Sequence, residues 1–140
     1  MEQYFSGQSI VTDGVSSTNI TREIEIHVAE SGIVNGFCHL SCVHTSASIL
    51  VQENASPDVQ RDLMKFLARV APMKSGLYEH DIEGIDDMPA HLRTAITQTH
   101  ITMSIIDGRL VLGEWQGIFL LEHRQTGSTR DLKVHIMGSH

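Results

Sequence analysis

The chain has 140 residues, 41% of them hydrophobic and 19% charged, which is typical of one soluble globular domain and excludes an extensively disordered chain. No apolar run reaches about 18 residues and the N-terminus lacks a signal-peptide pattern, so we expect a cytoplasmic protein with no membrane partner. The formal net charge of −7, with no run of Lys or Arg, argues against a nucleic-acid partner.

The first half of the chain shows strand patterns followed by a helix. Residues 22–28 alternate apolar and polar side chains and, with residues 35–44, are predicted to form consecutive antiparallel strands; residues 48–53 suit a further strand. Ser56 and Pro57 then form a helix start, and Pro72 ends the helix. Its apolar stripe is predicted to contain Val59, Leu63, Phe66, Leu67 and Val70.

The sequence of the second half of the chain predicts one shorter helix and several strands. The helix is expected to begin at Pro89 and to end near Thr97. Asp107-Gly108 lies between two apolar runs and predicts a two-residue β-hairpin. Residues 114–124, with Trp115 expected in the core, and residues 131–137 complete the strands. These elements together predict an α+β fold with antiparallel β-sheets and two principal helices.

The whole chain, residues 1–140, is predicted to be a single domain, because it contains no repeat, linker or low-complexity tract. The last three residues, 138–140, could be a cloning remnant and are left out of the fold prediction. Cys38 and Cys42 are separated by about 13 Å on an extended segment, too far for a disulfide, so both are expected to be reduced and buried.

The stretch "HDIEGIDDMPAH", residues 80–91, brackets a group of carboxylates with two histidines. His80 and His91 could bind a divalent metal, with Asp81, Glu83, Asp86 and Asp87 orienting the imidazoles. The alternative is a solvated acidic loop beside the positive end of the 89–97 helix. In "HTSAS", residues 44–48, two hydroxyls follow a histidine, an arrangement that could place a nucleophile beside a base. The favoured interpretation is that these hydroxyls bond to the local backbone.

Three blocks in this order resemble the YjbQ-like family: "HTSASILVQENASPDV" (44–59), "HDIEGIDDMPAHLR" (80–93) and "DGRLVLGEWQGIFLLEHR" (107–124). With the stretches between them they cover most of the chain from about residue 20. The chain departs from the family pattern at Glu114, where Thr is usual, and at Gln98, where Gly is frequent. The carboxylate of Glu114 weighs against phosphate binding nearby.

The resemblance implies a site assembled from the polar residues of all three blocks. It implies His44, His91 and Glu53 as catalytic residues, and His44, His80 and His91 as ligands of a divalent metal, zinc or magnesium. The residues implied to contact a small phosphorylated ligand are Thr45, Ser46, Asn54, Gln116, Glu122 and Arg124, with Arg93 as a further phosphate partner.

The family carries the name secondary thiamine-phosphate synthase, and the resemblance therefore implies a transferase that joins a pyrimidine diphosphate to a thiazole phosphate. Two alternatives are a metal-dependent hydrolase of phosphate esters and a non-enzymatic module that binds a small ligand or a metal. The resemblance also implies a homotrimer, and a sheet with few helices to cover it would leave apolar surface for such contacts.

Overall fold

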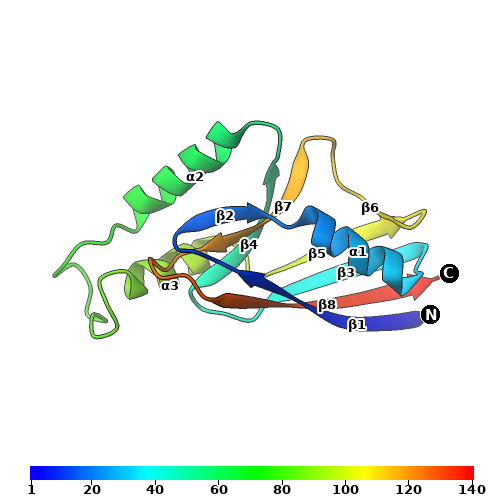
Figure 1. The fold of residues 1–140 in the computed structure, drawn as a ribbon, viewed down its shortest axis with the longest axis horizontal. Helices are drawn as coiled ribbons and strands as arrows, with labels where there is room; N and C mark the ends of the chain where they lie inside the picture. Colours follow the sequence, from blue (N-terminus) through cyan, green and yellow to red (C-terminus); the bar gives the residue numbers. More distant parts are fainter.

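A computed structural model describes all 140 residues and contains eight strands and three helices. In chain order the elements are β1 (Glu2–Val11), β2 (Ser16–Asn19), α1 (Thr21–Ser31), β3 (Asn35–Cys42), β4 (Ala47–Glu53), α2 (Pro57–Val70), α3 (Asp87–Ile96), β5 (His100–Ile106), β6 (Arg109–Leu110), β7 (Gln116–Glu122) and β8 (Thr129–Ser139). The α+β fold class is confirmed, with a third helix added. β1 pairs with β8 along its full length, so the two termini lie side by side (Figure 1).

The strands form two antiparallel sheets, one of five strands in the order β1-β8-β3-β5-β6 and one of three strands in the order β2-β7-β4. The main core lies between the five-stranded sheet and a second layer made of α1 and the three-stranded sheet, because its 17 buried residues come from all three. A smaller cluster on the other face of the three-stranded sheet joins Leu67 of α2 to Phe119 and Leu121 of β7. β7 is therefore buried on both faces.

Residues 22–28, predicted to be a strand, lie in helix α1, so that prediction was wrong. Ile20, Ile24 and Val28 recur every four residues and are buried, whereas Ile26 is half exposed. A four-residue period of buried side chains is helical, and Gly32 ends the helix in the left-handed conformation with φ 68°. The strand that was predicted to pair with it, β3, pairs with β5 and β8 instead.

Other elements agree with the sequence more closely. α2 begins at Pro57 and ends before Pro72, and the hairpin at Asp107-Gly108 has φ 52° and 74° at its two central residues, as a type I′ turn requires. Strand β7 is shorter than predicted, and Trp115 before it is 59% exposed, so the expectation of a core tryptophan was wrong.

Two strands in the first 20 residues, β1 and β2, were not predicted. Gly138 and Ser139, left out of the fold prediction, lie in β8, where Gly138 pairs with Glu2. No helix is both long enough and apolar enough to cross a bilayer.

The apolar stripe of α2 is only partly buried. Leu67 is 2% exposed, but Phe66 and Val70 remain half exposed, and the Ser56 hydroxyl bonds to the Asp58 carboxylate rather than capping the helix. Figure 1 shows α2 and the loop after it at the end of the molecule opposite the two termini.

The face of the five-stranded sheet that points away from the core, here called the outer face, is covered by no other element. Side chains that alternate with the buried ones emerge there, among them Phe5, Phe37, Ile106 and Met137, all exposed. The ring of Phe5 stacks on His135, with centroids 4.3 Å apart.

Candidate metal centre

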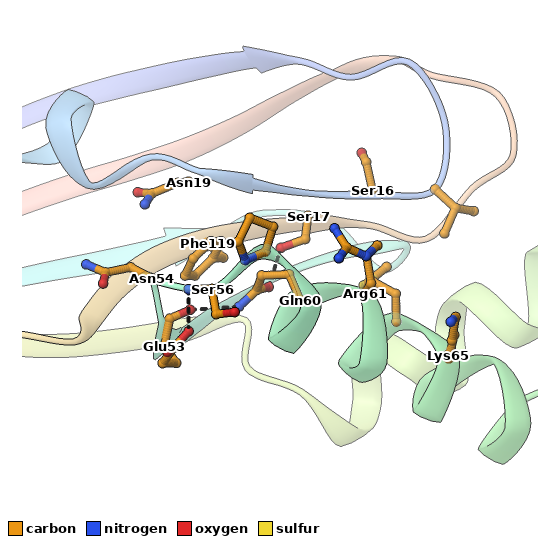
Figure 2. A pocket seen from close by; sticks show the side chains of 13 residues that line it. Ser16, Ser17, Asn19, Glu53, Asn54, Ser56, Gln60, Arg61, Lys65 and Phe119 are labelled. Atoms are coloured by element: carbon orange, nitrogen blue, oxygen red, sulfur yellow. Dashed lines mark hydrogen bonds between the residues drawn. The ribbon is translucent and has the colours of Figure 1, made fainter.

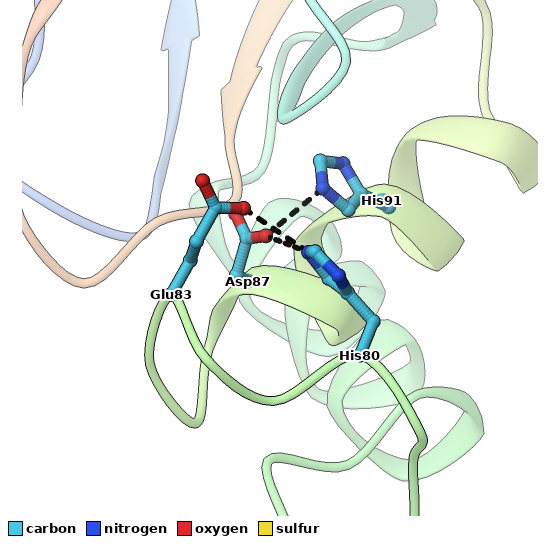
Figure 3. A group of neighbouring side chains, drawn as sticks. All are labelled: His80, Glu83, Asp87 and His91. Carbon is cyan, nitrogen blue, oxygen red and sulfur yellow. Dashed lines mark hydrogen bonds and ion pairs between the residues drawn. The ribbon is translucent and has the colours of Figure 1, made fainter.

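Four side chains meet where the loop after α2 enters α3, and we call them the His80–His91 cluster: His80, Glu83, Asp87 and His91 (Figure 3). One ligand atom from each lies within 4.8 Å of the others. Asp87 and His91 are four residues apart in α3, so they share one face of the helix. The Oδ2 atom of Asp87 is 2.7 Å from Nε2 of His80 and 3.0 Å from Nε2 of His91.

The orientation of His91 is fixed by a backbone contact. Its Nδ1 lies 2.8 Å from the carbonyl oxygen of Thr45, an acceptor only, so Nδ1 carries the proton and donates it there. In a neutral imidazole the Nε2 lone pair then points at the carboxylate of Asp87, which is unfavourable unless a cation lies between them. The cation is either a second proton on His91 or a metal ion, and a hydrogen bond from Nδ1 to a carbonyl is the usual support of a metal-bound histidine.

Arg124 orients the carboxylate of Asp87 from the opposite side. Its Nη1 donates to Oδ1 of Asp87 at 2.5 Å, its Nε donates to Asp86 at 2.9 Å, and its Nη2 donates to the Glu83 carbonyl. Burial raises the pKa of Asp87, but the hydrogen bond with His80 and the charges of His91 and Arg124 bring it below its usual value. Asp87 is therefore an anion whose Oδ2 is left for the cluster.

The imidazole of His80 is exposed and bonded to two carboxylates. Its Nε2 lies 3.1 Å from Glu83 in addition to its contact with Asp87. The hydrogen bond with Asp87 raises the pKa of His80. The two carboxylates thus stabilise the protonated form of the His80 imidazole relative to its neutral form.

His44, the third predicted metal ligand, lies outside this cluster. Its Nε2 accepts the backbone N–H of Asp131 at 2.8 Å, and its Nδ1 faces the guanidinium of Arg130 at 3.4 Å. Burial, and then the charge of Arg130, lower the pKa of His44. Neither nitrogen offers a free lone pair to a metal, although His44 and His91 both line one open cavity with Thr45.

Two of the predicted ligand-binding residues, Ser46 and Glu122, contact Arg130. Glu122 is fully buried, and its two oxygens accept from Nε of Arg130 at 2.8 Å and from Nη2 at 2.5 Å. The Thr12 hydroxyl also donates to it, and Ser46 accepts from Arg130. These contacts join the segment after β1 to β7, β8 and the loop before β4 in the protein interior.

Glu53 and Asn54 lie in a third place, beside a cavity of about 590 Å³ between β2, the end of β4 and the start of α2 (Figure 2). We call it the α2 cavity. Gln116 lies beside them in space, paired with Glu53 across β4 and β7, but its side chain accepts the backbone N–H of Gly113. The structure thus divides the predicted site into the His80–His91 cluster, the Glu122–Arg130 pair and the α2 cavity.

Two polar groups were missed or misjudged at the sequence level. His123 is buried, and its Nε2 lies 2.8 Å from the hydroxyl of Ser48, which also accepts from Thr97. Arg93, expected to hold phosphate, is buried and donates through Nε and Nη2 to the carbonyl of Ala71 at the end of α2. The direct role of Asp87 had one sequence signal, its spacing of four residues from His91 on a helix.

Comparison with known proteins gives consistent matches along nearly the whole chain. Residues 8–139 match the family described as UPF0047 protein YjbQ-like. A UPF0047 protein of Synechocystis sp. is 47% identical over 129 residues, covering 92% of this chain and 88% of its own. The UPF0047 protein YjbQ of Escherichia coli O157:H7 is 41% identical over 120 residues, covering 85% and 86%.

Solved structures agree with these sequence matches. A YbjQ-like protein of unknown function from Sulfolobus solfataricus P2 superposes with a TM-score of 0.91 at 27% identity, covering 99% of both chains. A YjbQ/UPF0047 family protein from Clostridium acetobutylicum gives a TM-score of 0.87 at 34% identity, covering 94% of this chain and 99% of its own.

None of these descriptions names a transferase or a thiamine-phosphate synthase. The prediction of a thiamine-phosphate synthase-like transferase, on which the expectation of an enzyme rested, was therefore wrong. The family match extends over residues 8–139, so this chain belongs to the UPF0047 YjbQ-like family.

Proposed function

We propose that this protein is a metal-binding module that holds one divalent ion at the His80–His91 cluster. The observation that carries this proposal is the hydrogen bond from His91 to the Thr45 carbonyl, which aims the Nε2 lone pair at Asp87. The ligand atoms of His80, Glu83, Asp87 and His91 surround one point, where a cation could be coordinated by all four.

The donor types favour zinc or a similar first-row ion over magnesium. Two imidazoles and two carboxylates form a mixed nitrogen and oxygen set, whereas magnesium prefers oxygen ligands and retains several waters. Tetrahedral zinc needs its four donors about 3–4 Å apart, given metal–ligand distances of about 2.0–2.2 Å. The cluster, with its donor atoms within 4.8 Å of one another, needs only small side-chain adjustments to reach that geometry.

Zinc titrated into chelator-treated protein is expected to bind with one equivalent per chain, and His91→Ala is expected to weaken binding about 100-fold because it removes a ligand. Isothermal calorimetry measures both. His100→Ala, which removes an exposed histidine outside the cluster, serves as the matched control and should bind like the unaltered protein. Equal affinity of the unaltered protein and a His80→Ala/His91→Ala double variant would refute the site.

A homotrimer is the assembly that we infer for this chain. The outer face leaves Phe5, Phe37 and Ile106 in solvent, although such side chains contribute more when they are buried. Contacts made by this face in a closed ring would cover it in every chain at once.

Light scattering at low micromolar concentration is expected to give a mass near three 15.5 kDa chains. Phe37→Glu places a charge on the outer face and is expected to shift the mass to that of one chain. Ile26→Glu, at a similarly exposed isoleucine of α1, should leave the mass unchanged. A monomeric mass for the unaltered protein would contradict the assembly.

The cytoplasm is the compartment that we infer. Cys38 and Cys42 are buried free thiols, and burial raises their pKa values to about 12 and about 11. Thiols in this form are inert and suit a reducing compartment, which supports the inference.

A further inference from the structure

The α2 cavity is separate from the metal centre and presents polar atoms with fixed orientations. Its volume of about 590 Å³ lies in the range of small-molecule sites. Gln60 crosses one wall, accepting from the Ser17 hydroxyl at 2.6 Å and donating to the Glu53 carbonyl at 3.2 Å. These bonds connect β2 to the start of α2 and fix the positions of the cavity walls relative to each other.

At one end of the cavity, three side chains each form hydrogen bonds within the protein through one polar atom and have a second polar atom available for a ligand. Glu53 accepts the Ser56 N–H with Oε2, which leaves Oε1. Asn54 donates Nδ2 to the Gln116 carbonyl, which leaves Oδ1 as an acceptor. Asn19 accepts from Thr21 through Oδ1, which leaves Nδ2 as a donor. The first two residues therefore offer acceptors to a ligand that carries N–H groups.

Gly117 allows this end to form. A Cβ atom there would lie 3.1 Å from Cβ of Asn54, 3.2 Å from Nδ2 of Asn19 and 3.3 Å from the Phe119 ring. All three neighbours line the cavity, so the glycine lets them approach one another.

The other end of the cavity is cationic. Figure 2 shows Arg61 and Lys65, one turn apart on α2, across the cavity from Asn19, Glu53 and Asn54. Neither cation forms an ion pair within the protein, and both are exposed. In a chain with a net charge of −7, this local positive end favours an anionic group.

We propose that the α2 cavity binds a small bipolar molecule, with an amino group at Glu53 and Asn54 and an anionic group, phosphate or carboxylate, at Arg61 and Lys65. The hydrogen bonds that orient Glu53, Asn54 and Gln60 form without ligand, so binding does not have to order them. The apolar side chains of Phe119 and Met64 provide a contact for the part of the ligand between the two groups.

Matched probes test this proposal on chelator-treated protein, which keeps it independent of the metal centre. Pyridoxamine 5′-phosphate carries both groups, pyridoxine 5′-phosphate lacks the amine, and pyridoxamine lacks the phosphate. A second two-group probe, 4-(aminomethyl)benzoate, carries an amine and a carboxylate on a different ring. Calorimetry is expected to give binding about tenfold tighter for pyridoxamine 5′-phosphate than for either truncated probe.

Variants assign the two ends. Glu53→Gln should remove the advantage of the amine and leave pyridoxine 5′-phosphate binding unchanged, and Arg61→Gln/Lys65→Gln should remove the advantage of the phosphate. Arg69→Gln, farther along α2 and outside the cavity, is the matched control and should bind every probe like the unaltered protein. The proposal is overturned if the two-group probes bind no better than the truncated probes, or if Arg69→Gln loses as much affinity as the Arg61 and Lys65 double variant.

Discussion

Replacing Glu122 with glutamine is expected to lower the free energy of unfolding by about 3–5 kcal/mol, the usual cost of removing one partner of a buried ion pair. Glu122 is fully buried, and its carboxylate is the only one that Arg130 contacts. Burial raises the pKa of Glu122, but the hydrogen bonds from Arg130 and Thr12 bring it below its usual value, so the pair is ionised at neutral pH. With glutamine, the guanidinium stays buried without a counter-charge.

Urea denaturation of the single and double variants measures this effect. Glu122→Leu/Arg130→Met removes both charges and fills similar volume, so it should be considerably more stable than Glu122→Gln. If the single variant lost less than about 1 kcal/mol, the value of an exposed pair, the interior position of this pair would have no energetic consequence.

Lowering the pH from 7 to 4 is expected to cost about 3 kcal/mol through His123 alone, since one pKa unit corresponds to about 1.4 kcal/mol. Burial, and then the charge of Arg93, lower the pKa of His123 from 6.5 to about 4. Below pH 6.5, His123 therefore takes up a proton in the unfolded chain but stays neutral in the folded chain until the pH approaches 4. The stability contributed by neutral His123 is complete above pH 6.5 and is lost as the pH falls toward 4.

Comparison with His123→Gln isolates this residue, because glutamine can still bond to Ser48 but does not titrate in this range. The free energy of unfolding of the variant should fall about 3 kcal/mol less than that of the unaltered protein between pH 7 and 4. His44 contributes in the same direction and His80 in the opposite one, and both remain in each protein. Parallel pH profiles would show that His123 takes up its proton at the same pH in the folded and unfolded chains, which would contradict the lowered pKa.

The sequence correctly predicted those helices and turns whose signals lie in a few adjacent residues. The helix from Pro57 and the hairpin at Asp107-Gly108 depend on residues adjacent in the chain, and both were located correctly. Residues 22–28 fit both the alternation of a strand and the periodicity of a helix. The four-residue spacing of the buried side chains Ile20, Ile24 and Val28 corresponds to the helix that the structure shows. That period becomes visible only when the window extends beyond the seven alternating residues.

The candidate site was predictable only where its residues are close in sequence. His80 and His91 belong to one 12-residue stretch, and the structure brings them together with Asp87. His44 resembled a third ligand, but its nitrogens face a strand 86 residues away. The pairing of Ser48 with His123 spans 75 residues, and the bond from Arg93 to Ala71 depends on where α2 ends. Such long-range contacts leave no signal in a single sequence.

The end of β7 distributes three successive side chains to three different environments. Glu122 points to Arg130 in the protein interior, His123 to Ser48, and Arg124 to Asp86 and Asp87 beside the His80–His91 cluster. Inserting or deleting a single residue within β7 would send each of these side chains to the environment of its neighbour. We therefore expect changes of length to be excluded from β7, because one such change would disturb a buried ion pair, a buried hydrogen bond and the support of Asp87 together.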